Sequence, residues 1–156
     1  MITFDIPGFK KVEAEHLVLD FNGTMAIDGK LIDGVTELLE ELSGKLLIHV
    51  LTADTFGTSK HELASIGCTL NILETGDQEM QKEHFVTNLG KDSVIAIGNG
   101  ANDSFMMFQA AISILTLQQE GACGSLFSIA DIVCTSITDA LKLLLNPLRM
   151  IATLRK

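Results

Sequence analysis

Three polar clusters and one lysine in this chain have side chains suited to phosphate chemistry. The first apolar run ends at Asp20, which begins the cluster DFNGT (residues 20–24). A later run is followed by TAD (residues 52–54) and another by GNGAND (residues 98–103), and Lys82 lies between these two clusters. In open α/β sheets, ligands bind beyond the carboxyl ends of the strands. The clusters are therefore candidates for one shared site.

The residue types indicate phosphoryl transfer. A carboxylate with an ordinary pKa of about 3.9 is ionised at neutral pH, so Asp20 can attack phosphorus without a general base and form an aspartyl-phosphate. The transferred group spreads negative charge over its oxygens, so cations and hydrogen-bond donors have to surround it. Lys82 supplies a charge and Thr52 a hydroxyl. Backbone N–H groups can approach a phosphate closely at the glycines of these clusters, Gly23, Gly98 and Gly100.

A metal ion fits the same clusters. Asp20 and Asp103 are the remaining carboxylates for a hard cation. Mg²⁺ typically uses one or two carboxylates together with waters and substrate phosphate. The sequence therefore predicts a Mg²⁺-dependent site for a small phosphorylated substrate.

Short apolar runs alternate with segments of helical spacing, which is typical of a parallel α/β sheet. Helical spacing is clear from Val35 to Leu42 and from Met80 to Leu89. The apolar runs, which we expect to be strands covered by helices on both faces, are residues 16–20, 46–51, 68–73, 93–97, 112–115 and 132–134. The predicted fold is a doubly wound, Rossmann-like parallel sheet.

The length suits one domain over residues 1–156. Within it we expect an amino-terminal β-hairpin over residues 1–15 that turns at Pro7-Gly8, because apolar and polar residues alternate there. The catalytic core is expected over residues 16–135, and a carboxy-terminal helix and tail over residues 136–156. Only a short flap, residues 25–33, and one helix fit between the first two clusters, so no large cap domain is predicted.

Composition excludes several partners. The net charge of −9 argues against a nucleic-acid surface, and no apolar run approaches the roughly 18 residues of a membrane span. The amino terminus lacks the pattern of a signal peptide. The odd number of cysteines, three without a CxxC pair, suits reduced thiols, so we expect a cytoplasmic protein. High hydropathy and the apolar hairpin suggest a homo-oligomer.

The clusters resemble the four motifs of the haloacid-dehalogenase superfamily. DFNGT is similar to DxDGT, or to the DKTGT of P-type ATPases, and GNGAND is similar to GDGxND. Residues 51–54 (LTAD) and Lys82 resemble the second and third motifs. The resemblance covers about residues 16–135 and is closest to the soluble, capless phosphatases that are like P-type ATPases. It implies core strands in the order 3-2-1-4-5.

The resemblance also implies roles for single residues. Asp20 would be the nucleophile, with Thr52, Lys82 and Asn22 completing the catalytic set. The residues that would bind phosphate are Gly23, Thr24, Thr52, Ala53, Lys82 and Asn102. The residues that would hold Mg²⁺ are Asp20, Asn22 through its backbone carbonyl, Asn99 and Asp103.

Two positions depart from the family pattern. Asn22 stands where the phosphatases have the Asp that protonates the leaving oxygen, and an amide cannot transfer a proton. General acid–base catalysis is worth roughly 10²–10⁴ in rate, so we expect slow turnover or a restriction to good leaving groups. Asn99 stands where the family has a metal-binding Asp, which predicts weaker metal affinity.

Other interpretations remain open. Asp20 could be a turn carboxylate, and Lys91 competes with Lys82, although it precedes its strand and so lies at the wrong end of the sheet. Asp54 could orient the second motif or cap the next helix. The glycines of the fourth motif could indicate dinucleotide binding, but the third glycine of GxGxxG is missing. The rival function is a non-catalytic phosphate- or nucleotide-binding module that acts as a regulatory subunit.

Overall fold

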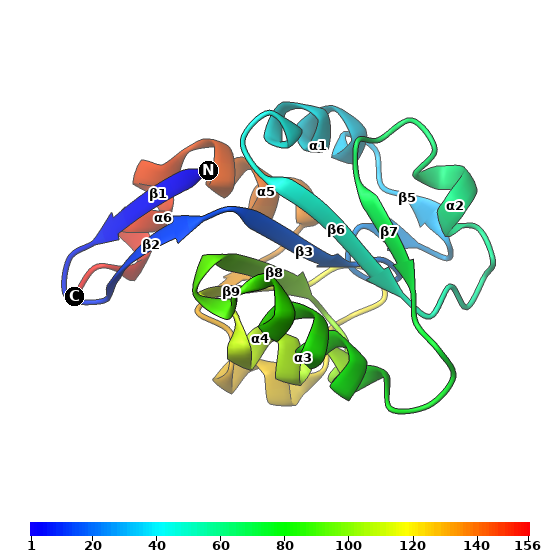
Figure 1. The fold of residues 1–156 in the computed structure, drawn as a ribbon. Coiled ribbons are helices and arrows are strands. Elements are labelled where there is room, and N and C mark those ends of the chain that lie inside the picture. The colour runs from blue at the N-terminus through cyan, green and yellow to red at the C-terminus, as the bar shows by residue number, and fades with distance from the viewer.

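A computed structural model describes all 156 residues (Figure 1), and its centre is one parallel sheet. The strands lie in the order β10-β9-β8-β3-β6-β7, and each neighbouring pair is parallel. Their bounds are β3 His16–Asp20, β6 Leu47–Thr52, β7 Thr69–Ile72, β8 Val94–Gly98, β9 Ile112–Thr116 and β10 Ile132–Cys134. This confirms the predicted doubly wound sheet and its 3-2-1-4-5 order, which β10 extends by a sixth strand.

Helices cover both faces of the sheet, as the apolar strands require. Alternate residues of β3 point to opposite faces: Leu17 and Leu19 belong to one buried cluster and Val18 to the other. Figure 1 shows α3 and α4 together on one face of the sheet and α1 on the other. The α-helices are α1 Val35–Ser43, α2 Ser59–Glu62, α3 Gln78–Leu89, α4 Ser104–Gln109, α5 Ile137–Leu145 and α6 Pro147–Leu154. Single turns of 3-10 helix are η1 Lys91–Ser93, η2 Ala101–Asp103 and η3 Gly124–Ser128.

The amino-terminal hairpin consists of β1 (Ile2–Ile6) and β2 (Lys10–Ala14), which pair antiparallel as predicted. Its apolar face, which includes the fully buried Phe4, joins the larger core cluster. Helix α6 covers this hairpin (Figure 1) and begins at Pro147, a residue that favours the first turn of a helix. Residues 147–154 were expected as a tail, so that prediction was wrong. Because the hairpin is covered within the chain, its apolar face no longer supports an oligomer.

A two-stranded flap follows the first motif, with β4 (Ala26–Ile27) paired antiparallel to β5 (Lys30–Leu31). This matches the short flap predicted over residues 25–33, and no cap domain is present. None of the helices has the length and apolar character that a membrane crossing requires. No separate domain therefore covers the carboxyl ends of the parallel strands.

Candidate active site

Three neighbouring strands bring the predicted clusters together. Strand β3 ends at Asp20, β6 at Thr52 and β8 at Gly98, and β3 lies between the other two in the sheet. A cavity of about 170 Å³ lies at these strand ends. It is lined by Asp20, Asn22, Thr52, Ala53, Thr55, Gln78, Asn99, Gly100 and Asn102. Asp20 is the only ionisable residue among them.

Lys82 joins the first motif to the fourth. Its Nζ lies 2.7 Å from Asp20 Oδ1 and 2.6 Å from Asp103 Oδ1, and its side chain is fully buried. The geometry therefore places Lys82, a residue of α3, beside the candidate nucleophile. Lys91 is exposed on η1, before the start of β8, and contacts neither carboxylate.

Burial dominates the electrostatics of this cluster. Burial raises the pKa of Asp20 to about 6, and the neighbouring Asp103 carboxylate adds to the rise, while Lys82 opposes it. Burial alone would lower the pKa of Lys82, but the carboxylates of Asp103 and Asp20 outweigh it and raise that pKa above its ordinary value. Lys82 is therefore a permanent cation next to Asp20, and Asp20 can be ionised at neutral pH.

Asp103 makes contacts that differ from the ligand role predicted for it. Its Oδ1 accepts from Lys82, and its Oδ2 accepts the N–H groups of Asn99 at 3.0 Å and Gly100 at 2.9 Å. It is fully buried and does not line the cavity. Both oxygens are thus engaged within the protein, and Asp103 holds the turn of the fourth motif and the Lys82 ammonium in place.

Gly98 allows close packing within the fourth motif, and Gly23 allows it between the first and fourth motifs. A Cβ on Gly98 would lie 2.5 Å from Asp103 Oδ2, and one on Gly23 would lie 2.3 Å from Asn99 Nδ2. Gly23 also has a φ of +80°, which disfavours other residues. The hydroxyl of Thr24 joins the first and fourth motifs as well, because its Oγ1 lies 3.2 Å from Asp20 Oδ2 and 3.1 Å from Asn99 Oδ1.

The backbone donors of the site differ from those expected. The N–H of Gly23 donates to Ala26 O at 2.7 Å and the N–H of Gly100 to Asp103, so neither is free for phosphate. The N–H groups of Asn22 and Ala53, two residues that line the cavity, donate to no other group of the protein. The N–H groups of Thr55, Gln78 and Asn102, which also line the cavity, donate to no other group of the protein either, so all five are backbone donors available to an anion.

The second motif is fixed by Asp54. Its N–H donates to Thr52 Oγ1 at 2.9 Å, and its Oδ1 accepts the N–H of Ser59, the first residue of α2, at 3.0 Å. Since Thr52 Oγ1 accepts from Asp54, its O–H remains free to donate into the cavity. Asp54 therefore does both of the tasks considered for it: it orients the second motif and caps the start of α2.

The oxygen donors of the cavity include only one carboxylate. Asn22 Oδ1 is buried without a hydrogen-bond partner, and Asn99 Oδ1 contacts only Thr24. No three His, Cys, Asp or Glu side chains converge anywhere in the chain. The donors Asp20, Asn22 and Asn99 suit Mg²⁺, which keeps waters and takes further oxygens from substrate phosphate. Because only one of these donors is a carboxylate, a Mg²⁺ ion here would take its remaining ligands from waters and from substrate phosphate.

Gln118, in the loop after β9, is a site residue that the sequence did not reveal. Its Nε2 donates to Gly23 O at 3.1 Å and also contacts Thr24 O, and its Oε1 accepts the N–H of Ile137 at 3.0 Å. Sequence motifs do not register contacts of this kind, because the partners are backbone carbonyls. The same loop contacts the fourth motif, since Asn99 Nδ2 donates to Gly121 O at 3.0 Å.

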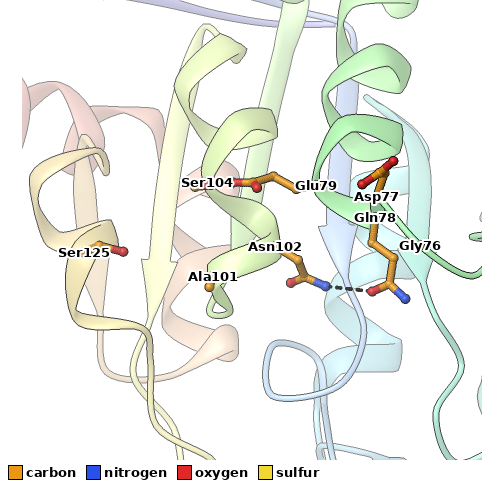
Figure 2. A pocket seen from close by; sticks show the side chains of 8 residues that line it. All are labelled: Gly76, Asp77, Gln78, Glu79, Ala101, Asn102, Ser104 and Ser125. Carbon is orange, nitrogen blue, oxygen red and sulfur yellow. Dashed lines mark hydrogen bonds between the residues drawn. The ribbon is translucent and has the colours of Figure 1, made fainter.

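A second cavity, of about 460 Å³, adjoins the first between the start of α3 and the η2–α4 segment. The two cavities share Gln78 and Asn102, whose side chains are joined at 3.2 Å. Figure 2 shows this pair and, farther along the cavity, Glu79 beside Ser104. Asp77 and Glu79 line the cavity, and no Lys, Arg or His does. This second cavity, which adjoins the candidate site, is therefore polar and acidic.

Comparisons by sequence give relatives of unassigned activity. No protein-family model matches the chain. It is 38% identical over 84 residues to the uncharacterized protein MJ0073 of Methanocaldococcus jannaschii, a match that covers 51% of this chain and 90% of that protein. It is 49% identical over 39 residues to the uncharacterized protein MJ0072 of the same organism, which covers 25% of this chain and 89% of that protein.

Several solved structures with the same architecture are hydrolases. A subfamily III A hydrolase of the HAD superfamily from Legionella pneumophila superposes with a TM-score of 0.72 at 16% identity, over 91% of this chain and 87% of that one. The 3-deoxy-D-manno-octulosonate 8-phosphate phosphatase of Moraxella catarrhalis, solved with magnesium, phosphate and its sugar acid, gives 0.69 at 15% identity, over 92% and 94%. The chain therefore has the fold of the haloacid-dehalogenase superfamily, and by sequence it belongs to the same family as MJ0073.

Proposed function

We propose that this chain is a Mg²⁺-dependent phosphoryl-transfer enzyme that forms an aspartyl-phosphate on Asp20. One observation carries the proposal: Asp20 is the only ionisable residue lining a cavity whose other groups are suited to an anion. Its donors include the free N–H groups of Asn22 and Ala53 and the hydroxyl of Thr52. Lys82, 2.7 Å from Asp20, supplies the charge.

In this reaction a carboxylate oxygen of Asp20 forms a bond to phosphorus, and the bond from phosphorus to the leaving oxygen breaks. The electron pair of that bond stays on the leaving oxygen. Water then attacks the aspartyl-phosphate and releases inorganic phosphate and the free carboxylate. Asp20, Asn22 and Asn99 would hold Mg²⁺, which neutralises phosphate charge when bound. That the Moraxella phosphatase was solved with magnesium and phosphate supports a divalent ion in this fold.

The cavity lining favours substrates with good leaving groups. No residue other than Asp20 in that lining can give or take a proton near neutral pH, because position 22 is an amide. A leaving oxygen that needs protonation is therefore expelled slowly. The leaving groups of acyl phosphates, aryl phosphates and phosphoanhydrides depart without being protonated. We therefore expect these compounds as substrates. The same lack of a base slows attack by water, so the phospho-enzyme is expected to last long, as in the P-type ATPases that the motifs resemble.

The acidic residues of the second cavity restrict the expected class of small phosphorylated substrates further. Asp77 and Glu79 line the cavity into which a leaving group would extend, and no cation offsets them. A leaving group with its own carboxylate, such as the sugar acid of the Moraxella phosphatase, would be repelled here. We therefore expect acyl and aryl phosphates whose leaving groups carry no further negative charge to be better substrates than phosphoanhydrides.

The rival is a phosphate-binding module without turnover, and the two amides at positions 22 and 99 favour it over an ordinary phosphatase. Incubation with ³²P-labelled acetyl phosphate and Mg²⁺, followed by acid quenching, separates the two. If the chain is an enzyme, we expect stable covalent ³²P label on the wild type and none on Asp20→Asn. Binding of beryllium fluoride without any covalent label from acetyl phosphate would instead support the module.

A further inference from the structure

We infer that Gln118 is a positioning residue for the nucleophile loop: its side-chain amide holds the loop so that Asp20 and its donors face the cavity. This inference rests on the proposed function, since it assigns a task in the same reaction. Gln118 lies 94 residues from Thr24 in the sequence and in none of the four motifs. It is partly buried in the loop after β9.

The contacts of Gln118 are directed at the backbone that carries the site. Its Nε2 donates to Gly23 O at 3.1 Å and contacts Thr24 O, so one amide group orients two successive peptide carbonyls. The free N–H of Asn22 lies one residue before Gly23 in the same segment. Rotation of this short segment would move the Asn22 N–H out of the cavity.

Thr24 transmits the same restraint to the reacting carboxylate. Its hydroxyl lies 3.2 Å from Asp20 Oδ2 and 3.1 Å from Asn99 Oδ1, and its carbonyl is the one that Gln118 contacts. The flap restrains this segment as well, since Gly23 N–H donates to Ala26 O at 2.7 Å and Ala26 N–H to Phe21 O at 2.9 Å. These bonds stay within residues 21–26, whereas Gln118 ties the segment to the loop after β9.

The opposite end of Gln118 is anchored independently. Its Oε1 accepts the N–H of Ile137 at 3.0 Å, at the first residue of α5. An amide is the group that can donate at one end and accept at the other. A carboxylate of the same shape keeps the contact to Ile137 but has no N–H for the Gly23 and Thr24 carbonyls, which it repels. Gln118→Glu therefore separates the positioning contact from the anchoring contact.

The test compares Gln118→Glu with Gln119→Glu, the same charge change at the exposed neighbouring residue. The rate of covalent labelling by acetyl phosphate is measured against its concentration, well below the melting temperature of each variant. We expect Gln118→Glu to lower the saturating labelling rate about tenfold or more, since misplacing a reacting group by ~1 Å costs up to 10². Because Lys82, Thr52 and Ala53 keep their contacts, the half-saturating concentration should change by less than about threefold. Gln119→Glu should match the wild type in both.

The possible outcomes are distinct. A Gln118→Glu variant that is labelled at the wild-type rate overturns the inference and leaves the proposed function intact. The inference is also overturned, and the proposed function left intact, if circular dichroism shows that the unfolded fraction of Gln118→Glu accounts for its slower labelling. The residue would then contribute to stability alone. If the wild type itself takes no label and binds no beryllium fluoride, the proposed function fails and this inference fails with it.

Discussion

Lys82 Nζ lies 2.6 Å from Asp103 Oδ1, and both side chains are completely buried. A buried cation is favourable only when its partners offset the cost of removing it from water. Here the partners are Asp103 and Asp20, one from the fourth motif and one from the first. The ion pair therefore couples the stability of the fold to the geometry of the nucleophile.

Replacing Lys82 by Met should lower the free energy of unfolding by about 3–5 kcal/mol near pH 8, because two buried carboxylates lose their cation. The pKa of Asp20, already raised to about 6 by burial and by Asp103, should rise further without Lys82. The native variant then binds more protons than the unfolded chain does, so its stability should increase as the pH falls toward about 5. Urea denaturation at both pH values measures this. Lys91→Met, at an exposed lysine, is the control, and an equal loss at both pH values would contradict the argument.

Asn22→Asp should increase the hydrolysis of alkyl phosphates at least about tenfold, since general acid–base catalysis contributes roughly 10²–10⁴. Asn22 lines the cavity and its side-chain oxygen has no hydrogen-bond partner, so a carboxyl group at this position gives up no contact. Release of inorganic phosphate from glycerol phosphate measures the gain. The double variant with Asp20→Asn is the control and should stay inactive. An unchanged rate in Asn22→Asp would show that proton transfer is not what limits this site.

Gly98→Ala tests the close packing of the fourth motif. The new Cβ would lie 2.5 Å from Asp103 Oδ2, and Asp103 cannot retreat because it is fully buried and holds Lys82. Overpacking of this kind costs about 1–3 kcal/mol, and labelling of Asp20 should fall as well. Gly124→Ala is the matched control, because nothing lies within 4 Å of its added Cβ. Denaturation curves and label incorporation that coincide for the two variants would refute the packing argument.

The amino end of the sheet contains a titratable pair. His16 Nδ1 and His49 Nε2 lie 3.1 Å apart, and the His49 ring also packs edge-on against Phe85. Burial lowers the pKa of His49 below its ordinary 6.5, and the nearby His16 lowers it further. The unfolded chain therefore binds this proton at a higher pH than the native protein does. As the pH falls below about 6.5, His49 therefore lowers the free energy of unfolding. His49→Gln should reduce the acid-side decline in unfolding free energy, whereas His84→Gln, at an exposed histidine, should not.

Features of the fold and the site that follow a local sequence pattern could be predicted from the sequence. Asp20 and Thr52 could be placed at one edge because each follows a continuously apolar strand, and parallel strands end on the same side. The packing tasks of Gly23 and Gly98 could not be predicted, since they depend on where the side chains of Asn99 and Asp103 lie in the folded chain. Asp103 was expected to contact a metal because its type suits one, but its contacts depend on the buried position of Lys82. Helix α6 was missed because Pro147 ends one helix and also begins the next.

Asp77→Asn tests the role of the acidic second cavity. Asp77 lines the larger cavity and has a φ of +42°, which Asn tolerates as well as Asp does, so the backbone should not change. We compare 4-carboxyphenyl phosphate with 4-carbamoylphenyl phosphate, which differ at one group by a single charge. The wild type should prefer the amide, and Asp77→Asn should narrow the ratio of the two kcat/KM values about twofold to threefold, as expected for one screened charge several ångströms away. Asp92→Asn, an exposed acid at the other end of the sheet, should leave that ratio at its wild-type value. If the ratio stays the same in Asp77→Asn, the leaving group does not extend past Gln78 and Asn102 into that cavity, and the expected preference for uncharged leaving groups is wrong.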